Sequence, residues 1–122
     1  MEASKVVILG KATTVEDLFT GMDNGSITPG RNLRIHGQRL RIAGNDPAVV
    51  GVWFVAAGES AERIRLDDRD LIDNDPSKLT LIAPTLPSGG YFVEIVTQSS
   101  SSAKQLLKEP RTYRFEIMMT VE

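Results

Sequence analysis

Few residues of this chain have the types and spacing that chemistry requires. The chain has one histidine, His36, and no cysteine, which removes thiolate nucleophiles, disulfides and cysteine-based metal sites. His36 alternates with Leu33 and Ile35 in a predicted strand, so its side chain is expected to face away from the core. No Gly-x-Ser-x-Gly turn accompanies it, and no glycine-rich loop has the lysine–serine pair of a phosphate-binding loop. We therefore expect no enzyme, no catalytic residue and no cofactor.

Five aspartates between residues 67 and 75 raise the question of a metal site, because hard cations prefer several converging oxygen ligands. Their spacing lacks the alternate ligands, central glycine and terminal glutamate of an EF-hand loop. Asp and Asn before Pro76 are also ordinary turn residues, and Arg63, Arg65 and Arg69 supply neutralising partners. We expect turns and ion pairs here, and no metal site.

The most suggestive binding feature is a group of arginines around His36, with no acidic residue among them: Arg31, Arg34, Arg39 and Arg41. If residues 32–36 and 39–42 are strands, Arg34, Arg39 and Arg41 project from the outer face of a sheet and could contact DNA phosphates or a partner. Nucleic-acid surfaces on sheets usually interleave aromatic residues, and none occurs in this segment. Exposed arginines also pair with acidic neighbours or protect a sheet edge. Both interpretations stay open, and the solvated face is preferred.

Alternating and β-branched patterns predict the elements that position these residues. Alternation is clearest at residues 113–121 and at residues 91–96, and residues 49–56 are apolar on both faces, as in a central strand. Shorter strands are predicted at residues 5–9, 32–36, 39–42, 64–66, 70–72 and 78–82. Seven to nine short strands separated by turns predict an all-β, immunoglobulin-like antiparallel β-sandwich, whose core includes Trp53, Tyr91 and Phe115.

Only two stretches have a pattern compatible with a short helix. Residues 14–19 could form a turn capped by Thr14 with Asp17 three residues on, and residues 103–109 could form about two turns. The second stretch lies in a long, serine-rich connection, residues 98–111, which we interpret as a slack loop.

Composition and length predict one domain, with a lead-in at residues 1–23 that holds the first strand and an immunoglobulin-like body at residues 24–122. Fourteen basic and sixteen acidic residues give a net charge of −2, too balanced for a whole-molecule attraction to DNA or an acidic membrane. The opening residues lack a signal-peptide core, and the longest apolar stretch, residues 49–57, is about half the ~20 residues of a membrane-spanning helix. We expect a cytoplasmic protein without membrane contact.

Several segments, in order and spacing, resemble a bacterial domain family of unknown function with an immunoglobulin-like fold. They are ITPGRNLRIHG (27–37), IAGNDP (42–47), VGVWF (50–54), NDPSKL (74–79), IAP (82–84), GY (90–91), TQ (97–98) and LLKEPR (106–111). In that family the domain usually follows an HU/IHF-like DNA-binding domain. The resemblance therefore implies an accessory module whose DNA binding comes from its neighbour.

Three functional hypotheses follow. The first is a non-catalytic interaction module that contacts a protein partner or a neighbouring HU-like domain, in the cytoplasm near the nucleoid. The second is direct DNA contact through the arginine-rich sheet face. The third is a cell-surface adhesion or glycan-binding module, since this fold serves many unrelated functions.

Overall fold

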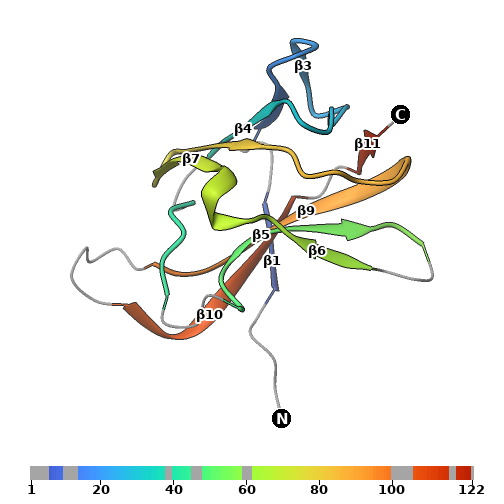
Figure 1. The fold of residues 1–122 in the computed structure, drawn as a ribbon. Coiled ribbons are helices and arrows are strands. Elements are labelled where there is room, and N and C mark those ends of the chain that lie inside the picture. Colours follow the sequence, from blue (N-terminus) through green and yellow to red (C-terminus); the bar gives the residue numbers. More distant parts are fainter. Residues whose placement is uncertain are drawn as a thin grey trace.

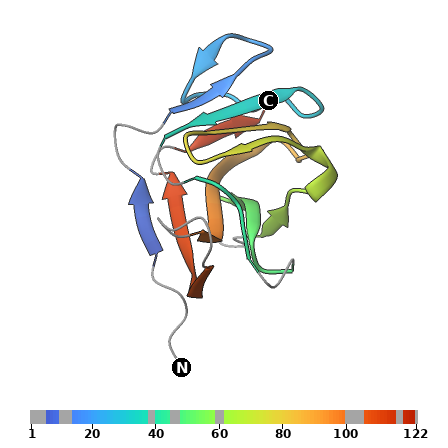
Figure 2. The same cartoon turned by 90° about the vertical axis from the view of Figure 1, so that its left-hand side faces the viewer.

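The structure of the chain is a computed structural model that describes residues 6–9, 14–37, 40–44, 48–58, 62–99, 106–115 and 118–121. Within these residues eleven strands form two sheets, more than the seven to nine predicted. Figure 1 shows the strands of both sheets, and Figure 2 shows the five-stranded sheet lying across the top of the six-stranded sheet. The predicted all-β sandwich is confirmed.

The six-stranded sheet has the order β1-β10-β9-β5-β6, with β11 also paired to β9. Its strands are β1 (Val6–Leu9), β5 (Gly51–Ala56), β6 (Arg63–Arg65), β9 (Gly89–Ser99), β10 (Leu106–Phe115) and β11 (Met119–Val121). All its pairings are antiparallel except that of β1 with β10, which is parallel. The β-branched and aromatic run of β5 lies centrally, between β9 and β6, as its composition predicts.

The five-stranded sheet has the order β3-β2-β4-β8-β7 and is antiparallel throughout. Its strands are β2 (Thr14–Asp17), β3 (Met22–Asp23), β4 (Asn32–His36), β7 (Leu71–Asp75) and β8 (Lys78–Ile82). A 3-10 turn, η1 (Asp68–Asp70), precedes β7 and lies between β6 and β7 in Figure 1. The predicted domain division after residue 23 stays a prediction.

The core lies between the sheets, where alternate residues of strands such as β2, β4 and β11 are buried. Val52 and Phe54 of β5 and the apolar set of β9 meet Leu33 and Ile35 of β4 across the interface. Phe115 and Tyr91 are buried in this core as predicted. The Tyr91 hydroxyl also donates a 2.7 Å hydrogen bond to the Pro87 carbonyl in the preceding loop, the arrangement that sandwich domains use to fix a corner.

Both helix predictions are wrong where the structure describes the residues. Residues 14–17 form strand β2, because Val15 is buried and pairs opposite Ile35 of β4, so sheet pairing outweighs the capping pattern. Residues 106–109 belong to β10, which extends the β9–β10 hairpin into the predicted loop; residues 103–105 lie outside the described residues.

Two strand predictions and one core prediction also need correction. Residues 40–42 have no strand structure, and Arg39 lies outside the described residues. The predicted strand 113–121 is divided, since β10 ends at Phe115 and β11 pairs with the opposite end of β9. Trp53 is only half-buried and points away from the core, because its neighbours Val52 and Phe54 occupy the inward positions.

Candidate functional site

The structure divides the predicted arginine group among several places. Arg34 and His36 lie on the outer face of β4, opposite the inward Leu33 and Ile35. Arg31 precedes β4, and its guanidinium stacks 4.5 Å from the ring centre of Phe19. Arg41 is exposed in the segment that follows β4. Arg34 and His36 therefore share a sheet face, and Arg31 and Arg41 do not belong to it.

Acidic and hydroxyl side chains surround Arg34 and His36. The Arg34 Nε donates to the Thr80 hydroxyl at 3.0 Å, and His36 Nε2 lies 3.2 Å from a Glu16 carboxylate oxygen. A hydrogen bond from Thr80 holds the pKa of Asp73 below its usual range, against a smaller opposing effect of burial, with the nearby Lys78 and Arg34 charges adding to the lowering. On this face Arg34 bonds to a hydroxyl group, and His36 and Lys78 each lie beside a carboxylate. Its predicted role in DNA or partner contact stays a prediction.

Two aspartates at η1 form ion pairs with arginines. Asp67 caps η1 by accepting from the Arg69 amide at 2.9 Å, and its second oxygen pairs with the Arg69 guanidinium at 3.0 Å. The Arg69 side-chain hydrogen bond is the main reason that the pKa of Asp67 falls to about 2. Asp68 pairs with Arg65 at 2.9 Å. Among the described residues, no three carboxylate, histidine or cysteine side chains gather as a metal site would require.

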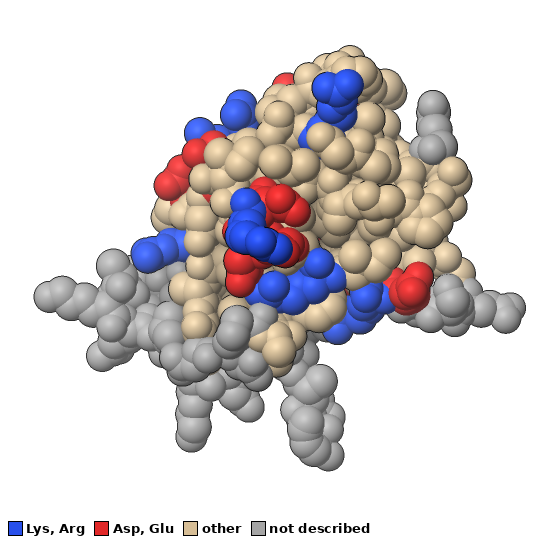
Figure 3. All heavy atoms as spheres, in the orientation of Figure 1, with Lys and Arg blue, Asp and Glu red and all other residues tan. Residues whose placement is uncertain are grey.

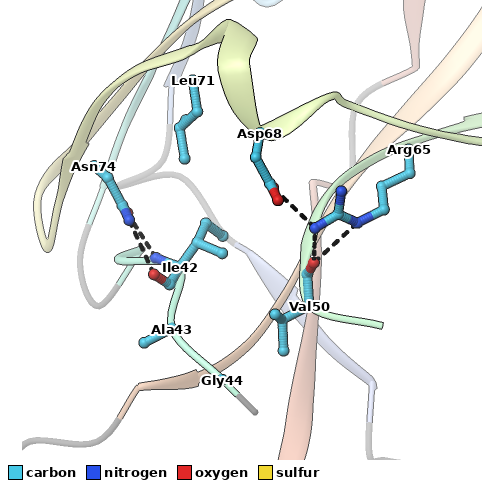
Figure 4. Close-up of a pocket in the computed structure, with 8 residues that line it drawn as sticks. All are labelled: Ile42, Ala43, Gly44, Val50, Arg65, Asp68, Leu71 and Asn74. Carbon is cyan, nitrogen blue, oxygen red and sulfur yellow. Dashed lines mark hydrogen bonds and ion pairs between the residues drawn. The ribbon is translucent and has the colours of Figure 1, made fainter. Parts of the chain in front are cut away.

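A pocket of about 390 Å³ opens between residues 42–44, β6 and β7. Figure 4 shows Ile42, Val50 and Leu71 along its apolar walls, with Asn74 and Arg65 on opposite sides. The Asn74 amide accepts from the Ile42 N–H at 2.7 Å and donates to the Ile42 carbonyl at 2.9 Å. The Arg65 guanidinium donates to the Val50 carbonyl at 2.6 and 3.0 Å. The polar groups of the pocket are thus engaged in holding its own walls.

Residues 40–44 form a strap between the two sheets. The Leu40 amide donates to the Pro76 carbonyl beside the five-stranded sheet, and the Gln98 amide of β9 donates to the Ala43 carbonyl. The buried Thr97 hydroxyl donates to the Arg41 carbonyl at 2.6 Å and accepts from the Ala43 amide at 3.1 Å. These bonds place Arg41 on the strap and off the face of β4.

A cluster on the outer face of the six-stranded sheet was not predicted from the sequence. We call it the arginine–aromatic cluster, and it consists of Trp53, Arg63, Phe92, Glu94 and Arg114. Glu94 is only 4% exposed, and its two carboxylate oxygens pair with Arg63 and Arg114. The sequence indicates that Phe92 and Glu94 face outward, since they alternate with the inward Tyr91 and Val93. It does not indicate which strands lie beside β9.

Charged side chains of both signs mark the molecular surface. In Figure 3, acidic and basic side chains lie against one another near the centre of the view, and most of the other described surface there is uncharged. No helix in the part of the chain that the structure describes is long and apolar enough to cross a bilayer.

The two packed sheets, with their tyrosine-fixed corner, define an immunoglobulin-like β-sandwich. Residues 11–113 match a domain of unknown function with an immunoglobulin-like fold, DUF4469, and the chain belongs to this family. The chain is also similar to the crystal structure of a proposed bacterial DNA-binding protein from Bacteroides vulgatus ATCC 8482, with 29% sequence identity and a TM-score of 0.82. That match covers 94% of this chain and 47% of the other, so this chain spans about half the length of its relative. No curated protein matches the chain.

Proposed function

We propose that this chain is a non-catalytic interaction module within a larger DNA-binding protein, and that an HU/IHF-like part of that protein supplies the DNA contacts. The observation that carries the proposal is the match to the Bacteroides vulgatus protein, which spans nearly all of this chain but less than half of the other. The unmatched part of such a protein has room for a separate DNA-binding domain.

The charges on the surface of the sandwich support the proposal that another part of the protein binds DNA. DNA binding depends on cations that are available to replace counterions at several phosphates. On the face of β4, Arg34 bonds to Thr80 and His36 lies against Glu16, while Asp73 adds negative charge. A net charge of −2 adds no long-range attraction. In this proposal the module acts in the cytoplasm beside the nucleoid, through contact with protein.

Direct DNA contact by this chain is the second candidate, because the relative is proposed to bind DNA and its similarity to this chain covers the sandwich itself. In that case Arg34 and the exposed Arg41 would be the contacts to test.

Fluorescence anisotropy with a labelled duplex of about 20 base pairs separates the two candidates. We expect the wild-type chain to bind more weakly than about 100 µM even at about 50 mM salt, the weak end of non-specific DNA binding. Micromolar binding that weakens with salt and is lost in Arg34→Gln with Arg41→Gln would overturn the proposal. Arg69→Gln serves as the control for the loss of an arginine away from β4, since Arg69 lies in η1.

A further inference from the structure

Strand register brings the members of the arginine–aromatic cluster together from four strands. Arg114 of β10 lies opposite Glu94 of β9, and Glu94 lies opposite Trp53 of β5. In the next row, Phe92 of β9 lies opposite Val55 of β5, and Val55 lies opposite Arg63 of β6. The cluster is therefore built on regular strands, which hold side chains more rigidly than loops do.

Glu94 fixes the positions of both arginines. The Arg63 Nη2 donates to one carboxylate oxygen at 3.1 Å, and the Arg114 Nε donates to the other at 2.7 Å, with a second bond from the Arg114 Nη2. A glutamate side chain that is 6% exposed is costly to bury unless its carboxylate is paired and hydrogen-bonded, so this geometry is strongly favoured over open alternatives.

The aromatic rings support the guanidiniums from a second side. The Arg63 guanidinium lies 4.5 Å from the ring centre of Trp53, and that of Arg114 lies 5.5 Å from the ring centre of Phe92. Both arginines nevertheless reach solvent, with side chains 46% and 38% exposed. Each guanidinium has five N–H donors. Within the described part of the chain, Arg63 gives one donor and Arg114 gives two to Glu94.

We propose that the arginine–aromatic cluster is a docking surface for an acidic segment of a partner protein. This inference rests on the proposed function, and it names the surface through which the interaction module would act. Side-chain carboxylates match the remaining, pre-positioned guanidinium donors. Glu94 and the rings already order both long side chains, which lowers the conformational-entropy cost of binding a partner. Tryptophan and arginine are also the residues that dominate binding energy at protein interfaces.

The chemistry of the cluster favours a protein over a nucleic acid. Single-stranded nucleic acids stack their bases on open aromatic rings, whereas here a guanidinium lies over Trp53 and another over Phe92. Two guanidiniums and one carboxylate leave a single net positive charge, too little for a salt-dependent grip on several phosphates. One or two partner carboxylates would balance it.

NMR spectra of the arginine Nε–Hε groups of the full chain provide the test. The probe is a capped hexapeptide of glutamates, with its glutamine counterpart as the neutral control and a short oligothymidine as the nucleic-acid alternative. We expect saturable shifts of Arg63 and Arg114 with a dissociation constant of roughly 0.1–1 mM for the glutamate peptide alone, which is the affinity of a few exposed charge-assisted contacts. The Arg69 signal should not move.

Variants extend the test. Arg63→Gln is expected to weaken binding of the glutamate peptide by about tenfold, which is about 1.4 kcal/mol, and Arg69→Gln should leave it unchanged. The inference is overturned if the wild-type chain shows no saturable shift, if Arg69 responds as Arg63 does, or if oligothymidine binds the cluster more tightly. The titration with duplex DNA is independent of this probe. DNA binding through Arg34 refutes the proposed function, while absence of peptide binding without DNA binding refutes this inference alone.

Discussion

Replacing Asp17 by Asn should destabilise the sandwich strongly, although the two side chains are nearly equal in size. Asp17 is fully buried at the end of β2, where one carboxylate oxygen accepts from the amides of Phe19 and Thr20 at 2.9 and 3.4 Å. The other accepts from the hydroxyls of Ser26 and Thr28 at 2.9 and 2.6 Å. The carboxylate thereby ties the turn after β2 to the segment that leads into β4.

The size of the effect follows from these bonds. Asn keeps the oxygen that faces the amides, but its NH₂ group cannot accept from the two hydroxyls. Hydrogen bonds to a charged group contribute about 1.5–3 kcal/mol each and neutral ones about 0.5–1.5, so two weakened bonds predict a loss of about 2–3 kcal/mol in the free energy of unfolding. Urea unfolding at pH 7, followed by the fluorescence of the single tryptophan, Trp53, measures it directly.

The same difference should depend on pH. Burial opposes ionisation of Asp17, but hydrogen bonds from Thr28, Ser26 and the two amides together hold its pKa below the ordinary value. A depressed folded-state pKa contributes stability above the unfolded pKa, about 3.9, and that contribution is lost as the pH falls through the folded value. The gap between wild type and Asp17→Asn should therefore be constant from pH 7 to about pH 5 and shrink below about pH 4. A gap under about 0.5 kcal/mol at pH 7, or one that does not change in acid, refutes this account of Asp17.

Three further substitutions test the strap, the corner and the pocket wall, each by urea unfolding at pH 7. Thr97→Val leaves the Arg41 carbonyl and Ala43 amide of the strap without their shared hydroxyl and should cost about 1–3 kcal/mol; a neutral result means that the strap does not depend on it. Tyr91→Phe removes the bond to Pro87 and should cost about 0.5–1.5 kcal/mol, whereas a stabilised variant contradicts the corner role. Gly51→Ala should cost about 1–3 kcal/mol, because Gly51 has a φ of 147° and an added Cβ would lie 3.0 Å from the Arg65 guanidinium; an unchanged free energy of unfolding contradicts the tight packing.

Local patterns predicted the sandwich, because inward and outward residues alternate in its long strands. They failed where distant parts of the chain decide the structure. Leu40 and Ile42 imitate strand alternation, yet the segment is held as a strap by Asn74 and Thr97, whose positions in the fold no local pattern reveals. The apolar run around Trp53 likewise does not say which face is covered by a second sheet and which by an arginine from β6.

The candidate sites follow the same rule. Arginine spacing correctly placed Arg34 on a sheet face, but the charges facing it come from β2, β7 and β8 and depend on strand order. The arginine–aromatic cluster joins residues from β5, β6, β9 and β10, so only the register of four strands brings it together.

The central claim is that this module contacts protein and leaves DNA to another part of its parent protein. Backbone and arginine NMR signals of the full chain, recorded while duplex DNA is added at about 50 mM salt, test it most directly. The account predicts that the signals of β4, including Arg34 and His36, stay in place at protein concentrations of about 100 µM. Saturable shifts centred on those residues would contradict it.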